Sequence, residues 1–373
     1  MSKTDQTGKF DKRFADSGTF KSHRMFLDSQ MVQKPKVTLV ILALVTLLAS
    51  LGGWYLIRFG KFDAMFSEGA PFPRSTTAVR GAGPILACLI DAKNVSALTA
   101  GTSDNFFVAT GSGVTQYKIG YGKQGISAES VWNRDFGAPV TALHYVSGEK
   151  ALDGMLLVAV GNKIETVNPN QTEGTGTVFA ELDADALITS IATDSVSVFA
   201  ADFGKKAVRR FDMLGAENLS IGQADETTGF EGLLLGAEPS FSIDFSPKNK
   251  TLLVANPEKR RVEAFDSQTG AWLKEFSFDS SAPNQTPNET DVCPASLHVL
   301  PNGVVLTLEK GNRAKMRNFT PEGAFISEID VPELVASEGQ VPLLAIGKSA
   351  AGKNQLLVLS AAGQLILYPE PAF

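Results

Sequence analysis

The chain has 373 residues, of which 43% are hydrophobic and 20% charged, and its formal net charge is −6. It is too long for a minimal domain and too apolar for an intrinsically disordered chain. Two cysteines and three histidines exclude a disulfide-rich scaffold and a four-thiolate zinc or iron–sulfur site, and they leave little material for metal or acid–base chemistry.

The first 57 residues predict a membrane anchor. Residues 1–36 are polar and basic, and Val37–Ile57 contains no charged residue. At ~1.5 Å per residue, a helix of that length spans a ~30 Å hydrocarbon core. The basic excess before the span predicts a cytoplasmic tail over 1–36, a signal-anchor helix over 37–57 and a C-terminal domain in the periplasm or outside the cell. A cleaved signal peptide is the alternative, which the long polar leader disfavours.

The two sides of this predicted anchor differ in charge. The first 36 residues carry a net +4, so the rest of the chain carries −10. Residues 58–77 form a short juxtamembrane linker, and residues 78–373 form the extracytoplasmic domain. Because nucleic-acid binding depends on neutralising phosphates, such an acidic domain is a poor candidate for it. We expect a membrane and a protein as partners, and no nucleic acid.

From about Ala78 the chain consists of short β-branched and aromatic runs that turn residues interrupt every 6–12 positions, which predicts an all-β domain. One landmark recurs at intervals of 45 to 54 residues, an apolar residue preceded by small or hydroxyl residues. It occurs at Leu98, Leu143, Ile191, Ile243, Leu297 and Leu344. An apolar strand, a turn and an alternating strand follow each landmark. Six such units predict a six-bladed β-propeller.

Three of the units resemble NHL repeats, a family of six-bladed propellers. The segments Ala201–Gly215, Ala255–Gly270 and Glu309–Gly323 each contain an acidic or amide residue at a strand end, a basic turn, an aliphatic residue, a phenylalanine and a glycine turn. The other three units lack the acidic residue. The resemblance implies an NHL-like propeller and, because lyases of this group hold a metal in the central channel, it directs attention to the channel.

The ends of the domain predict how the ring closes. The last strand, Gln364–Tyr368, ends five residues before the C-terminus, and Ile85–Ile90 precedes the first unit without belonging to it. We expect Ile85–Ile90 to complete the sixth blade.

The channel offers three candidate metal ligands. His144, Asp244 and His298 directly follow the landmark in units two, four and five, and two imidazoles with a carboxylate suit Zn²⁺. Because the other three units place Thr99, Ala192 and Ala345 there, we interpret these side chains as satisfied polar groups between blades. We assign no metal, no other cofactor and no catalytic residue.

Basic residues are concentrated in and after the turns that follow the apolar strands, and two long connections, Gly222–Glu238 and Asp279–Cys293, leave the blades on the same face. The candidate binding residues are Lys205, Lys206, Arg209, Arg210, Lys259, Arg260, Arg261, Lys310 and Arg313. On an acidic domain they predict a docking surface for an acidic protein. Ordinary solvated turns with interleaved acidic residues are the alternative.

The combined interpretation is a membrane-anchored, non-catalytic protein-binding or scaffolding module, for example a subunit of an envelope complex. A metal-dependent hydrolase or lyase with a site in the channel is the alternative, and a sensor that needs a separate effector is a third reading. Cys88 and Cys293 could form one disulfide in an oxidising compartment, but their separation is not readable from the sequence, and we favour two buried thiols.

Overall fold

The computed structural model describes residues 86–122, 125–148, 152–171, 176–194, 196–237, 239, 241–277, 293–310, 315–330 and 342–369. The chain divides into two compact units, residues 1–73 and 74–373, and the first lies outside the described residues. The predicted tail, anchor helix and linker therefore lie outside them too. Within the described ranges, no helix is long and apolar enough to cross a membrane.

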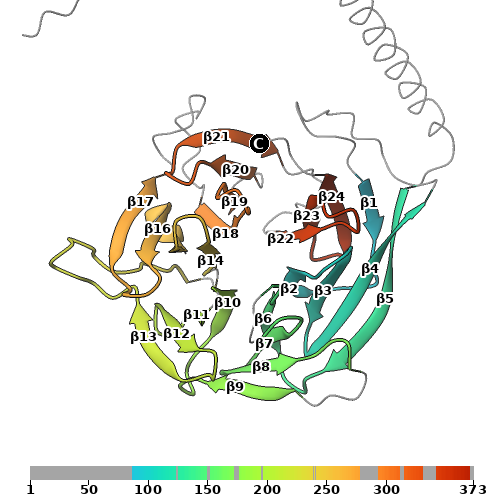
Figure 1. Ribbon diagram of the computed structural model, residues 1–373, viewed down its shortest axis with the longest axis horizontal. Coiled ribbons are helices and arrows are strands. Elements are labelled where there is room, and N and C mark those ends of the chain that lie inside the picture. The colour runs from blue at the N-terminus through green and yellow to red at the C-terminus, as the bar shows by residue number, and fades with distance from the viewer. Residues whose placement is uncertain are drawn as a thin grey trace, which may run out of the picture. The chain divides into compact units, whose positions relative to one another are not determined.

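The described strands form six antiparallel four-stranded sheets, which are arranged as a ring (Figure 1). Blade 1 contains β2 (Val95–Ala100), β3 (Asn105–Thr110), β4 (Gly113–Gly122) and β5 (Gly125–Asp135). Blade 2 contains β6 (Val140–Tyr145), β7 (Leu156–Val160), β8 (Lys163–Val167) and β9 (Thr177–Glu181). Blade 3 contains β10 (Ile188–Thr193), β11 (Ser197–Asp202), β12 (Ala207–Asp212) and β13 (Glu217–Ile221).

The remaining blades repeat this order. Blade 4 contains β14 (Ile243–Ser246), β15 (Thr251–Asn256), the short 3-10 helix η1 (Pro257–Lys259), β16 (Arg261–Asp266) and β17 (Trp272–Ser277). Blade 5 contains β18 (Cys293–Val299), β19 (Val305–Lys310), β20 (Lys315–Phe319) and β21 (Phe325–Asp330). Blade 6 contains β22 (Leu343–Lys348), β23 (Asn354–Leu359), β24 (Gln364–Pro369) and β1 (Leu86–Leu89). The predicted six-bladed propeller is confirmed.

The hydrophobic core lies between the blades rather than at the centre of the ring. The second strand of a blade is buried on both faces, as in β7 (LLVAV) and β11 (SVFAAD). The described side chains form six apolar clusters, each shared by two neighbouring blades. One blade cannot bury both of its faces alone, so each sheet depends on its two neighbours for stability.

The ring closes as expected. β1 pairs antiparallel with β24, with Leu86 opposite Leu367 and Leu89 opposite Gln364. N-terminal and C-terminal segments of the domain thus share one sheet, and the free edge that β24 would otherwise present is covered. The long β4–β5 hairpin of blade 1 packs Ile119 and Ile126 into the apolar cluster that contains β1 residues.

Candidate functional site: the channel and the basic face

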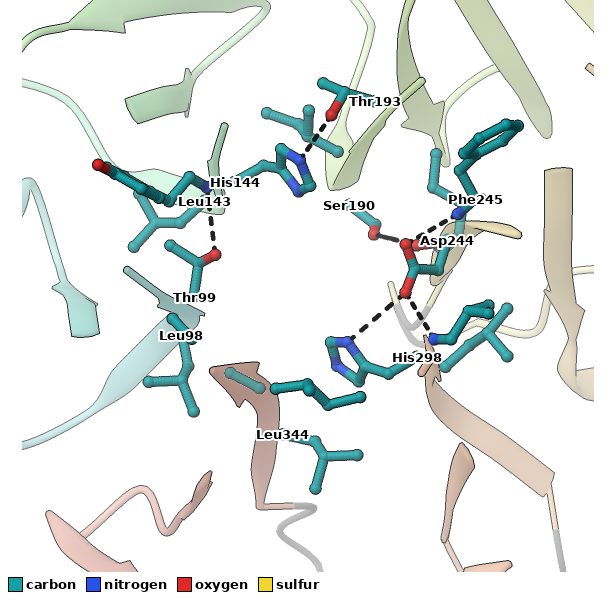
Figure 2. Close-up of a pocket in the computed structure, with 18 of the residues that line it drawn as sticks. Leu98, Thr99, Leu143, His144, Ser190, Thr193, Asp244, Phe245, His298 and Leu344 are labelled. Carbon is teal, nitrogen blue, oxygen red and sulfur yellow. Dashed lines mark hydrogen bonds and ion pairs between the residues drawn. The ribbon is translucent and has the colours of Figure 1, made fainter. Parts of the chain in front are cut away.

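The first strands of the six blades surround a channel of about 1360 Å³. Landmark residues such as Leu98 and Leu344 line it, together with several hydroxyl groups, two imidazoles and the carboxylates of Asp194 and Asp244. Figure 2 shows His144, Asp244 and His298 on the channel wall. Because an inner strand pairs on one edge only, its other edge leaves backbone N–H and C=O groups that need partners.

Side chains of one blade supply those partners to the next blade. Thr99 Oγ1 of blade 1 accepts from Tyr145 N of blade 2 at 3.2 Å, and Asp244 Oδ2 of blade 4 accepts from Val299 N of blade 5 at 2.7 Å. Further bonds of this kind join Ser190 to Ile243 N and Ser242 to Leu297 N, at 3.2 and 3.1 Å. The polar groups of the channel therefore hold the blades in register.

Recurrent β-bulges direct some of these side chains. The first strand carries an irregularity in blades 1, 2, 3 and 5, and a bulge re-aims the extra residue. Ser96 and Thr189 occupy such positions and donate to Val140 O and Phe241 O at 2.8 and 2.7 Å. Sequence analysis did not assign these hydroxyls a role, although they are the hydroxyl residues that precede the recurrent landmark.

The structure brings two of the three candidate ligands together. His298 Nδ1 lies 3.9 Å from Asp244 Oδ2, whereas His144 Nε2 is 3.0 Å from Thr193 Oγ1. Figure 2 shows His144 apart from the other two across the open channel. Across the described part of the chain, no three His, Cys, Asp or Glu side chains are arranged to hold a metal ion.

The surrounding protein shifts the pKa of each of these groups in the direction that favours its neutral form. Burial lowers the pKa of His144 to about 4, and the imidazole of His298 contributes to the same shift. Burial lowers the pKa of His298 to about 4, although a hydrogen bond with the Leu344 backbone acts to raise it. Burial raises the pKa of Asp244 to about 7, although the N–H groups of Val299 and Phe245 oppose it. Both imidazoles are therefore neutral at pH 7.

Two of the three acidic or amide residues of the NHL-like pattern are buried capping groups. Asp202 and Asn256 are fully buried. Asp202 Oδ1 accepts from Leu187 N at 3.2 Å, and Asn256 Oδ1 accepts from Leu234 N at 3.2 Å. Each carboxyl or amide thus satisfies a backbone group of the connection that enters its own blade.

Most of the candidate cations that the structure describes have hydrogen-bond or ion-pair partners within the propeller. Arg209 forms a bidentate ion pair with Glu217, in which Nε and Nη2 each donate to a carboxylate oxygen at 2.6 Å. Lys205 pairs with Asp185 at 2.9 Å, Lys259 with Glu231 at 3.0 Å and Arg261 with Glu263 at 2.6 Å. Arg210 donates to Ser197 and to Gln268 O. The side chain of Lys310, and Arg313 entirely, lie outside the described residues.

Lys206 and Arg260 differ from the rest. Their φ angles are +51° and +49°, a region that ordinary side chains rarely adopt. Each lies in the turn between the second and third strands, where blades 1, 2 and 6 carry a glycine at positive φ, namely Gly111, Gly161 and Gly363. Two cations thus occupy strained positions on one face of the ring.

The first long connection is packed against the ring. In the described part of Gly222–Glu238, Phe230 is 3% exposed, stacks on Trp272 with ring centroids 5.8 Å apart and meets Phe265 edge to face. Lys259 Nζ lies 5.7 Å from the centre of the Phe230 ring. The segment is therefore packed against the basic face, which is the face of the ring that carries the candidate cations. Most of the second connection lies outside the described residues.

Cys88 has a free thiol, and burial raises its pKa to about 11. The side chain of Cys293 lies outside the described residues.

No protein-family model matches the sequence, and a search of curated proteins finds no relative. A luciferin-regenerating enzyme superposes with a TM-score of 0.52 at 10% identity, covering 77% of this chain and 95% of that one. A nidogen–laminin complex gives 0.48 at 12% identity, covering 69% and 85%. The Myceliophteria thermophila Cps50 (Swd1) β-propeller domain gives 0.46 at 12% identity, covering 74% and 83%.

The fold is a propeller. At these identities the likeness extends to the fold alone, and no family model confirms the resemblance to NHL repeats.

Proposed function

We propose that this protein is a membrane-anchored β-propeller of the extracytoplasmic side, NHL-like in its repeats, which binds an acidic protein partner as a scaffold. A propeller is consistent with a protein-binding module. Membership of an envelope complex fits an anchor over residues 37–57 followed directly by such a domain. The channel supports binding over chemistry, because its hydroxyls and Asp244 make bonds between blades.

The observation that carries the proposal is the conformation of Lys206 and Arg260. A side chain in the left-handed region costs roughly 1–2 kcal/mol, and glycine avoids that cost. Strain of this kind points to a functional demand at the position. Lys206 is exposed and Arg260 is partly exposed, and both residues lie in turns at the end of the blades from which the long connections leave. These two cations are the proposed contacts to the acidic partner.

The test is affinity capture of the full-length protein from its native membranes, with three forms of the chain. We expect the Lys206→Gly/Arg260→Gly variant to lose a partner that wild type retains, because it lacks both charges while its backbone relaxes. Its stability should be unchanged or higher by up to about 1 kcal/mol. The matched control is Lys250→Gly, since Lys250 has a φ of +54° in the β14–β15 turn at the opposite end of the blade.

Capture should also weaken as the salt concentration rises from ~0.05 to ~0.5 M, because salt screens the contacts between exposed charges. A partner set that is identical for all three forms would overturn the docking surface. Protease protection in intact cells tests the anchor separately: the propeller should be accessible from outside the inner membrane and residues 1–36 should not.

A further inference from the structure

Asp244 is a partly exposed carboxylate on the channel wall with no cationic partner in the described part of the chain. Its side chain is 24% exposed, and it is one of the residues that line the channel. Two of its roughly four lone-pair sites are used by Phe245 N at 2.8 Å and Val299 N at 2.7 Å. Acceptor capacity therefore remains on a group whose burial without a counter-charge is unfavourable.

The neighbouring imidazole faces the same space without bonding to the carboxylate. His298 Nδ1 lies 3.9 Å from Asp244 Oδ2, which is too long for a hydrogen bond. A donor nitrogen at about 2.9 Å from each of the two atoms would bridge them. An ammonium group carries three N–H donors and no acceptor, so it suits two acceptors at this separation.

The other groups that line the channel beside Asp244 are neutral, and the charged groups lie at one end of the channel. His144 faces it across the channel from β6, and both imidazoles are neutral at pH 7. Ser190 and Thr193 of β10 add hydroxyl groups. Lys250 and Lys348 are exposed at the channel end formed by the β14–β15 and β22–β23 turns, and the buried carboxylate of Asp194 there caps its own turn.

We propose that the channel binds an alkylammonium ion, with its nitrogen between Asp244 and His298 and its hydrocarbon part against the leucine side chains of the inner strands. The cavity of about 1360 Å³ has room for a ligand of drug-like size. This inference is independent of the docking surface on the basic face, since the two involve different residues. Failure of either leaves the other standing.

The experiment is isothermal titration of the purified full-length protein with n-butylamine, and with n-butanol as a neutral analogue of the same length, at constant ionic strength. We expect saturable binding of the amine and at least tenfold weaker binding of the alcohol. Asp244→Asn should weaken amine binding at least tenfold. The matched control Glu226→Gln removes one carboxylate from an exposed loop position and should bind like wild type.

The pH dependence provides a second test in the wild-type protein, in case Asp244→Asn does not fold. Because the pKa of Asp244 is about 7 and the amine stays protonated, the ionised fraction of the carboxyl rises from roughly a tenth at pH 6 to nine-tenths at pH 8. Amine affinity should rise about tenfold over this range, with proton release on binding at pH 7. Equal binding of amine and alcohol, a flat pH profile, or unchanged affinity in a folded Asp244→Asn variant would each overturn the proposal.

Discussion

Among the single residues, His144 makes the clearest contribution to pH dependence. Its pKa is lowered to about 4 in the folded protein, so between pH 6.5 and 4 the unfolded chain binds a proton at this position that the folded chain does not. Its contribution to the free energy of unfolding is therefore full above pH 6.5 and decreases as the pH falls toward 4. His298, whose pKa is also lowered, reduces the free energy of unfolding in the same way as the pH falls. Asp244, whose pKa is raised, has the opposite effect.

The prediction concerns the difference between His144→Gln and wild type. Glutamine can still bond to Thr193 but does not titrate. The stability of the variant relative to wild type should therefore increase by about 3 kcal/mol between pH 7 and pH 4. Urea unfolding at several pH values, followed by tryptophan fluorescence, measures the difference. Parallel pH profiles for the two proteins would show that the imidazole does not titrate across this range on unfolding.

The three channel residues also show how far single positions could be interpreted from sequence. The equivalent placement of His144, Asp244 and His298 after the landmark was correct, because the repeat fixes position along the strand. To predict which of the three side chains lie close together, one must also know the position of each blade around the ring. Blades 4 and 5 are neighbours, so Asp244 and His298 meet, while His144 belongs to blade 2 and bonds to blade 3. Distances between side chains depend on packing that a repeat does not encode.

Among the elements, β19 and β20 of blade 5 contain a buried ion pair. Arg317 and Glu309 are each 1% exposed, with Arg317 Nη1 3.0 Å from Glu309 Oε2, although neither atom has hydrogen-bond geometry. Arg317 Nε also contacts Glu328 at 2.8 Å. Burial raises the pKa of Glu309 to about 7 even with this arginine beside it. The pair is thus close to balance between charge attraction and loss of hydration.

Removing one member should cost far more than removing both. We predict that Arg317→Met destabilises the domain by about 3–5 kcal/mol, because Glu309 is left buried without a cation. The double variant Arg317→Met/Glu309→Gln should recover more than half of that loss, since no uncompensated charge remains. Chemical denaturation of the two single variants and the double variant gives the coupling energy. Additive effects would mean that the two side chains act independently.

The elements themselves could be predicted well, and their surroundings less so. Short apolar runs that turn residues interrupt every 6–12 positions identify the strands, because alternation and turn residues are local properties. The landmark that recurs at intervals of 45 to 54 residues identifies the blades. The ion pairs of the basic face were not predictable in detail. Arg209 and Glu217, for example, pair across neighbouring strands, in a register that a bulge between Arg210 and Phe211 shifts.

At the scale of the whole propeller, stability depends on closing the ring. Each apolar cluster lies between two blades, so an open ring exposes the facing surfaces of blades 6 and 1 and loses cooperativity. The closure combines β1–β24 pairing with a polar contact: Tyr121 Oη donates to Asp104 Oδ1 at 2.7 Å, and Ala350 N donates to Asp104 Oδ2 at 2.7 Å. Blade 1 thus holds blade 6 through groups distant in sequence.

Deletion of residues 85–90 from the full-length chain should therefore abolish cooperative unfolding of the propeller. The deletion removes Leu86 and Cys88 from the cluster shared with blade 1 and leaves the edge of β24 unpaired. Gly363, at φ +83°, lies so close to the Ile90 and Ala92 carbonyls that a Cβ there would be 2.7 and 2.5 Å from them, so the turn is shaped to the closing segment. Deletion of residues 74–79 is the matched control of equal length. Differential scanning calorimetry should give one sharp transition for the control and none for the first deletion; a sharp transition in both would mean that blade 6 is stable with three strands, and that closure does not depend on β1.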